Sequence, residues 1–167
     1  MSNTPNPNVE GVDATKISDE VGGHTQPTRD PDPNATPGGH PTKIPKNADP
    51  DDVRSLGREN ESATTLARAG YDVEQNPQPL ANGKKPDYRV NGEVFDNYAP
   101  TSPSARNISR EMQKKIKKGQ TQRVVLNMAD TPVDLPAMRA QLHDWPVGGL
   151  KEVLAIDKLG NIVHLYP

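Results

Sequence analysis

The first 50 residues of this 167-residue chain contain no Phe, Trp or Tyr, so any aromatic core must come from the remainder. The stretch is rich in Pro, Asn, Asp, Thr and Gly, as in Arg29-Asp30-Pro31-Asp32 and Thr36-Pro37-Gly38-Gly39. Such a composition buries too little apolar surface to offset the conformational entropy that ordering removes. We therefore predict a disordered Pro/Asn/Gly-rich tail over residues 1–50, serving as a linker, a recognition tail or an export leader. The folded domain is expected over residues 51–167.

Composition excludes several classes of protein. The chain has no cysteine, which rules out disulfides and Cys-based zinc sites. The segment Met1–Glu10 has neither a basic nor an apolar region, so we expect no Sec signal peptide. No run of apolar residues approaches the length of a membrane span. The net charge of −2 says little about partners, so the distribution of charge matters more.

The dipeptide Asn91-Gly92 lies between two strand-like runs and is a strong signal for a two-residue β-hairpin. Before it, a helix is expected from Asp51 or Asp52 to Ala69, ended by Gly70. Periodicity and capping residues predict strands over residues 71–75, 88–90, 93–98, 123–128, 152–157 and 162–166, and further helices over 104–118 and 135–143. This order predicts one α/β or α+β domain with a mixed central β-sheet flanked by helices.

Asp87 and Asp96 stand at the two ends of this hairpin. In a two-residue hairpin centred on Asn91-Gly92, paired positions have numbers that sum to about 183. Asp87 would then face Asp96, with Cβ atoms within about 5.5 Å. Facing carboxylates repel, and a divalent cation such as Mg²⁺ or Mn²⁺ would remove the conflict. The alternative is two solvated carboxylates at a strand end, and a one-residue slip in register would separate them.

The first helix offers a third carboxylate. Glu59 lies on the stripe formed by Leu56, Ala63 and Leu66, which is expected to face the sheet, whereas Glu61 points elsewhere on the helix. A Glu on that stripe suggests a third metal ligand. The helix macrodipole alone also favours a carboxylate early in a helix, so both interpretations stay open.

Seven basic residues and one acidic residue occur between Arg106 and Arg123. Lys115 borders the stripe of Met112 and Ile116, so its amine is expected to reach the sheet, where phosphodiester cleavage needs positive charge. The other basic side chains suit contacts with phosphates, or else they form an ordinary solvated helix face. The residues expected to make these contacts, which would bind RNA if the substrate is RNA, are Arg106, Arg110, Lys114 and Lys118.

The histidines and the only Trp suggest no separate chemistry. His24 and His40 fall in the expected tail, and the spacing of His143 and His164 indicates no shared metal. We expect all four histidines to be inert or satisfied by ordinary contacts, and we expect Trp145 to pack in the core. The chain has no nucleophile elbow and no phosphate-binding glycine loop.

Short motifs occur in a fixed order along the folded part of the chain. They are Arg58-Glu59-Asn60-Glu61, Gly70-Tyr71, Glu74-Gln75-Asn76-Pro77, Lys85-Pro86-Asp87-Tyr88, Phe95-Asp96, Tyr98-Ala99-Pro100, Arg106-Asn107-Ile108, Lys118-Gly119-Gln120 and Val125-Leu126-Asn127. Together they resemble the C-terminal tRNase domain of contact-dependent growth-inhibition toxins (CdiA), over roughly residues 55 to 167. No single motif is specific, but the ordered series is fairly specific.

The resemblance implies a PD-(D/E)XK-like nuclease fold, cleavage of RNA such as tRNA, and a cognate immunity protein. It also implies a divalent metal, which would be Mg²⁺ or Mn²⁺, with Zn²⁺ as a further option. Asp87 matches the PD aspartate and Asp96 the (D/E) position. Glu59 matches the first-helix glutamate, with Glu61 as the alternative.

The lysine of the family motif is absent from its usual place. Asn97-Tyr98 stands where this lysine would follow Asp96. The lysine can migrate to the next helix in this superfamily, and Lys115 is our candidate.

A toxin of this kind would be a bacterial protein exported or delivered into the cytoplasm of a target cell; a domestic protein would be cytoplasmic. Two other functions stay open. One is a non-catalytic module of the same fold whose basic helix binds nucleic acid or an acidic partner. The other is a DNase, which differs from the first hypothesis only in its substrate.

Overall fold

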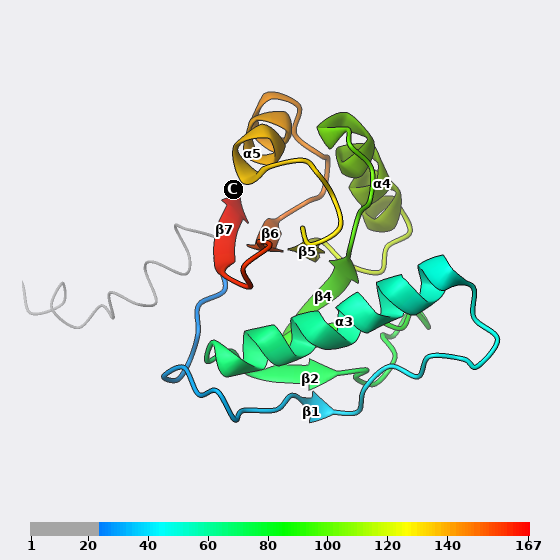
Figure 1. Ribbon diagram of the computed structural model, residues 1–167, viewed down its shortest axis with the longest axis vertical. Helices are drawn as coiled ribbons and strands as arrows, with labels where there is room; N and C mark the ends of the chain where they lie inside the picture. Colours follow the sequence, from blue (N-terminus) through cyan, green and yellow to red (C-terminus); the bar gives the residue numbers. More distant parts are fainter. Residues whose placement is uncertain (1–23) are drawn as a thin grey trace, which may run out of the picture.

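The structure is a computed structural model, and it describes residues 24–167. Its centre is a mixed β-sheet of seven strands (Figure 1). The sequence predicts a mixed central sheet of this type. The strands are β1 (Gly38–Gly39), β2 (Val73–Gln75), β3 (Tyr88–Val90), β4 (Glu93–Tyr98), β5 (Arg123–Asn127), β6 (Glu152–Ile156) and β7 (Ile162–Tyr166). No helix among the described residues is long and apolar enough to cross a membrane.

The strands lie in the sheet in their chain order, from β1 to β7. Antiparallel pairs join β2 to β3, β3 to β4 and β6 to β7, whereas β4, β5 and β6 are parallel. A helix connects each parallel pair, as the geometry of parallel strands requires. In the hairpin, Tyr88 pairs with Phe95 and Val90 with Glu93, which confirms the register expected from the Asn91-Gly92 turn.

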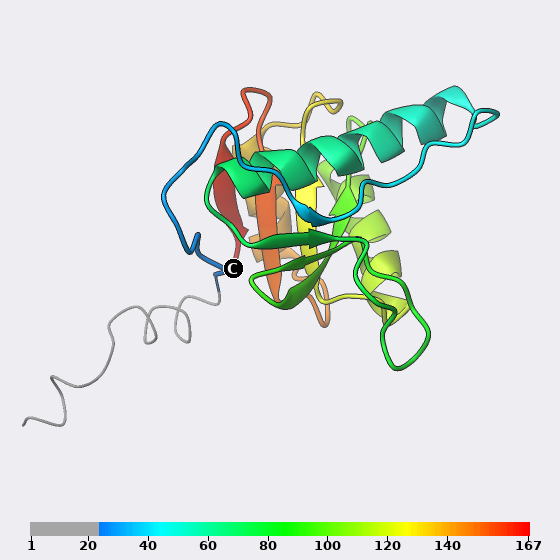
Figure 2. The ribbon, with the colours of Figure 1, turned by 90° about the horizontal axis from the view of Figure 1, so that it is seen from below.

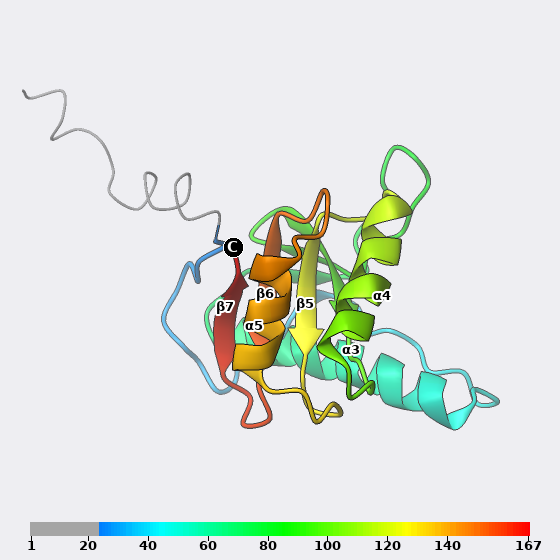
Figure 3. The ribbon, with the colours of Figure 1, turned by 90° about the horizontal axis from the view of Figure 1, so that it is seen from above.

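Three helices cover the two faces of the sheet: α3 (Pro50–Arg68), α4 (Ala105–Lys117) and α5 (Leu135–Asp144). Helices α4 and α5 lie over one face (Figure 3), and α3 crosses the other (Figure 2). Each side has its own apolar core. On one side, Ile108 and Met112 of α4 are buried in one core with Leu126 of the sheet. On the other, Leu66 of α3 is buried in a second core with Phe95 of the sheet.

The ends of α3 are set by local hydrogen bonds. Asp49 caps the N-terminus by accepting from the backbone N–H of Asp52 at 2.9 Å, and Pro50 occupies the first turn, where it needs no donor. The helix thus begins just before the expected Asp51 or Asp52. At the other end, the N–H of Gly70 and Tyr71 donate to the carbonyls of the last turn, a Schellman arrangement that requires the positive φ of Gly70.

The prediction of disorder is wrong for residues 24–50, which run along the domain beside β2 and β7 (Figures 1 and 2). Backbone hydrogen bonds hold this segment: Thr28 N–H donates to the Gly70 carbonyl at 2.9 Å, and His40 N–H to the Gln75 carbonyl at 3.2 Å. The composition argument counted apolar burial alone and so missed this main-chain pairing. The part of the predicted tail over residues 1–23 lies outside the described residues.

Trp145 also differs from its prediction. It is the C-cap residue of α5 and is 72 % exposed, so it does not pack in the core. The core on that side is filled by other residues, among them Met138 and Leu142 of α5.

The packing of residues 27–32 against the end of α3 is testable at Gly70. A Cβ at this position would overlap the carbonyl oxygen of Arg29, in addition to straining the positive φ. Gly160 also has a positive φ, but a Cβ there meets nothing within 4 Å. Gly160→Ala should therefore cost only the backbone strain, about 1–2 kcal/mol. Gly70→Ala should lower the free energy of unfolding by clearly more, as measured by urea denaturation. Equal losses would show that the segment does not pack as described.

Candidate active site

The β3–β4 hairpin places Asp87 and Asp96 against each other just beyond the last paired residues. The backbone N–H of Asp87 donates to Oδ1 of Asp96 at 3.0 Å, and the N–H of Asn97 donates to Oδ2 of Asp87 at 2.8 Å. Each carboxylate thus accepts a main-chain donor from the strand opposite. The facing arrangement expected from the hairpin is what the structure shows.

Asp87 is poorly placed to carry a negative charge on its own. Burial, then the charge of Asp96 and then that of Glu59, raise the pKa of Asp87 to about 8, against a smaller lowering by the Asn97 N–H. Asp96 is 2 % exposed. The raised pKa of Asp87 and the burial of Asp96 indicate that these carboxyl groups lie close together where little water screens their charges.

Glu59 of α3 completes the group of carboxylates, which we call the acidic triad: Glu59, Asp87 and Asp96. Its carboxylate accepts a hydrogen bond from the hydroxyl of Thr42, and its backbone carbonyl accepts one from the buried hydroxyl of Tyr88. The residue is therefore fixed both by the segment before α3 and by the sheet beneath it.

Thr42 is held in turn by a polar network that sequence reasoning did not find. Asn60 bonds the backbone of Thr42 from both sides, accepting from its N–H at 2.8 Å and donating to its carbonyl at 3.0 Å. Asn76 donates to the Thr42 hydroxyl at 3.1 Å and to the His40 carbonyl at 2.8 Å. Asn60 and Asn76 lie in motifs that carry the family resemblance, whereas Thr42 fell in the predicted tail.

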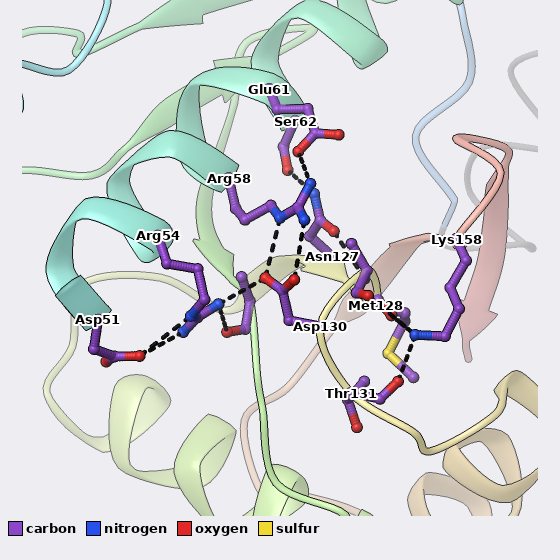
Figure 4. A network of polar contacts seen from close by, with 12 residues as sticks. Asp51, Arg54, Arg58, Glu61, Ser62, Asn127, Met128, Asp130, Thr131 and Lys158 are labelled. Atoms are coloured by element: carbon purple, nitrogen blue, oxygen red, sulfur yellow. Dashed lines mark hydrogen bonds and ion pairs between the residues drawn. The ribbon is translucent and has the colours of Figure 1, made fainter.

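Glu61 lies away from the acidic triad. Its carboxylate pairs with Arg58 at 2.6 Å and is half exposed (Figure 4). Arg58 and Arg54 also hold Asp130 through contacts of 3.0 and 2.9 Å, so this side of α3 carries a separate ion-pair network. Of the two candidate glutamates, the structure brings only Glu59 to the aspartates.

Gln120 is a second residue that sequence reasoning did not assign to the site. Its side-chain amide donates to Oδ2 of Asp96 from the loop between α4 and β5. The residue was visible only as part of the Lys118-Gly119-Gln120 motif, and nothing local in the sequence shows that this loop returns to β4.

The basic residues of α4 divide into two groups. Lys115 is half-buried, and its Nζ lies 5.5 Å from the centre of the Tyr98 ring, near the end of the strand that carries Asp96. The residues predicted to bind RNA, namely Arg106, Arg110, Lys114 and Lys118, are exposed. Among the described residues, only Lys114 of these four forms an ion pair, with Glu111 at 2.8 Å.

A cavity of about 440 Å³ adjoins the acidic triad. Thr42, which bonds Glu59, and Pro86, which precedes Asp87, both line it. Lys43 and Lys85 also line this cavity, and neither of them forms an ion pair with the acidic triad. The combination suits a polyanion that must pass close to carboxylates.

The donors of the acidic triad are of the chemical type that a hard divalent cation prefers. Within residues 24–167, no member of the acidic triad forms an ion pair with a Lys, an Arg or a His. None of the three carboxylates therefore has a positive side chain to balance it, and their oxygens are the ligand type that Mg²⁺ and Mn²⁺ prefer. The triad is not among the described groups whose ligand atoms all lie within 4.8 Å of one another.

Comparisons with known proteins agree with this fold. A family model described as the contact-dependent growth inhibition CdiA C-terminal domain matches residues 84–162. The chain is 48 % identical over 142 residues, 84 % of its length, to tRNA nuclease CdiA-2 of Burkholderia pseudomallei (strain 1026b), and it spans 4 % of that protein.

A solved structure, the CdiA-CT/CdiI toxin and immunity complex from Burkholderia pseudomallei, is similar in fold, with a TM-score of 0.75 and 48 % identity. The match covers 79 % of this chain and 99 % of the solved one. The expected family resemblance is thereby confirmed, and the chain belongs to the family of CdiA C-terminal toxin domains.

Proposed function

We propose that this chain is a metal-dependent ribonuclease toxin domain that cleaves tRNA. The observation that carries the proposal is the acidic triad, three carboxylates without an ion-pair partner beside a cavity whose lining includes Lys43 and Lys85. The substrate rests on the relative named tRNA nuclease CdiA-2, to which this chain is 48 % identical. The PD-(D/E)XK-like assignment of the triad is part of the same proposal.

In this proposal Asp87, Asp96 and Glu59 hold a divalent cation, Mg²⁺ or Mn²⁺ by their oxygen chemistry, with Zn²⁺ as a further option. When bound, the cation supplies Lewis-acid stabilisation of the negative charge that develops on the scissile phosphate.

The protein's own residues position the reacting groups. Gln120 fixes the orientation of the Asp96 carboxylate, and Thr42 fixes that of Glu59. Lys115, whose Nζ lies 5.5 Å from the Tyr98 ring at the end of β4, supplies an ammonium group that offsets charge in the transition state. These contacts are made before substrate arrives, so little reorganisation is needed during the reaction.

Phosphates away from the reacting centre bind the basic surface. Arg106 and Arg110, on the exposed side of α4, form no ion pair within the described part of the chain. Together with Lys114 and Lys118 they offer contacts to the backbone of a folded RNA, and binding should weaken as salt concentration rises.

A cognate immunity protein is part of the proposal, because the solved relative is a toxin and immunity complex. We also propose that the domain acts in a target cell after delivery, as the family description of contact-dependent growth inhibition suggests. A DNase would use the same site, so assays should include plasmid DNA beside tRNA.

The paired glutamates of α3 give the sharpest test of the triad. Glu59→Gln should lower the rate of tRNA cleavage by about 10²–10³-fold, because it removes a ligand, whereas Glu61→Gln should leave the rate near that of the wild type. Cleavage of total tRNA with Mg²⁺ or Mn²⁺ measures both.

Asp96→Ala and excess EDTA should each abolish cleavage while the circular-dichroism spectrum is kept. Full activity in EDTA would contradict the mechanism, and salt-sensitive binding without cleavage would indicate the non-catalytic module.

Lys115 and Lys117 form a second matched pair. Lys115→Met should reduce kcat by about 10²-fold with little change in KM, since the amine acts on the transition state rather than on binding. Lys117 is exposed on the same helix, so Lys117→Met should leave kcat nearly unchanged. Equal effects of the two substitutions on kcat would remove Lys115 from the proposed mechanism.

Because Asp87 is buried close to Asp96 and Glu59, we expect the stability of the protein in EDTA to fall as pH rises. Its pKa is raised from 3.8 to about 8, so the folded state binds the extra proton between these values and loses stability as pH rises through them. Asp87→Asn keeps an oxygen for the Asn97 N–H but removes the charge. At about pH 8.5 it should therefore raise Tm by about 2–8 °C, and at about pH 5 the gain should shrink. A Tm lowered equally at both pH values would contradict the account.

A further inference from the structure

A second cluster of ligand-type side chains lies at the far edge of the sheet from the acidic triad. His24, Glu152 and His164 each offer one atom, and these three atoms lie within 4.8 Å of one another. Glu152 opens β6, His164 lies on the edge strand β7, and His24 comes from the segment before β1. Strand β5 separates this cluster from β4, so the two groups of ligands are distinct.

The two histidines have buried ring nitrogens that nothing satisfies. Nδ1 of His24 and Nδ1 of His164 are both shielded from solvent and have no hydrogen-bond partner within residues 24–167. The rings stand nearly perpendicular, at 82°, with centroids 4.4 Å apart. Buried nitrogens left unpaired cost free energy, so a group that binds both would stabilise the fold.

Glu152 supplies a carboxylate that is already oriented. It is fully buried, and Arg123 holds its Oε1 at 2.7 Å, where Thr25 also donates its hydroxyl at 2.7 Å. The backbone N–H of Thr25 donates to Oε2. Partners of this kind orient a metal-binding carboxylate in many proteins. Oε2 keeps a lone pair for a further ligand, because a carboxylate oxygen can accept more than one contact.

We propose that His24, Glu152 and His164 form a Zn²⁺ site that fastens the segment before β1 to the edge strand β7. Two imidazoles and one carboxylate are a donor set that suits Zn²⁺, whereas Mg²⁺ and Ca²⁺ prefer oxygen ligands alone. Ligands at about 2.1 Å from a tetrahedral ion stand about 3.4 Å apart. Small side-chain rotations therefore close the cluster around an ion. The fourth position would be taken by water or another ligand.

The test uses the full chain with the acidic triad disabled, as the variant Asp87→Asn with Asp96→Asn. Titration with Zn²⁺ in a calorimeter should show one equivalent bound. Adding His24→Gln or His164→Gln should weaken binding by about 100-fold or more, beyond the usual loss of an outer-shell partner. His40→Gln is the matched control, because His40 is exposed and outside the cluster, and it should change nothing. Equal Zn²⁺ affinity in all variants, or no binding in the parent, overturns the proposal.

A second measurement does not depend on the folding of the histidine variants. Co²⁺ added to the parent chain should give the intense visible absorption of a four-coordinate ion, and Zn²⁺ should displace it. A weak six-coordinate spectrum, typical of oxygen ligands and water, would overturn the site.

Discussion

The proposed chemistry of this domain depends on the register of one hairpin. The Asn91-Gly92 turn pairs Tyr88 with Phe95, and that pairing sets Asp87 and Asp96 face to face. A shift of one residue would send one carboxylate to the other side of the sheet. Two hydrogen bonds from backbone N–H groups, those of Asp87 and of Asn97, hold the carboxylates in place although their charges repel. The fold therefore keeps two repelling carboxylates close together, and a bound cation would reduce this repulsion.

The rest of the molecule fixes what surrounds that pair. The stripe of α3 that packs on the sheet also delivers Glu59, and the segment before α3 returns along β2 to bring Thr42 to the same carboxylate. On the opposite face, α4 packs through Met112 and turns Lys115 toward β4. Residues 24–50 are consequently part of the site as well as part of the fold.

Much of this follows from local rules, and the remainder does not. The hairpin register and the choice of Glu59 over Glu61 could be predicted, because turn type and helical periodicity are short-range properties. The packing of residues 24–50 could not, since it rests on main-chain bonds such as Thr28 to Gly70, which leave no trace in composition. Gln120 and the contact of His24 with His164 depend on where loops and segments return in space, so spacing alone does not reveal them.

The central claim is that the acidic triad holds a divalent cation. Anomalous diffraction from crystals of the full chain grown with Mn²⁺ tests it most directly, because the signal locates the ion without reference to activity. The account predicts a peak among the carboxylates of Glu59, Asp87 and Asp96, bound by oxygens at about 2.1–2.3 Å. A map with no peak between these side chains at saturating Mn²⁺ would contradict it.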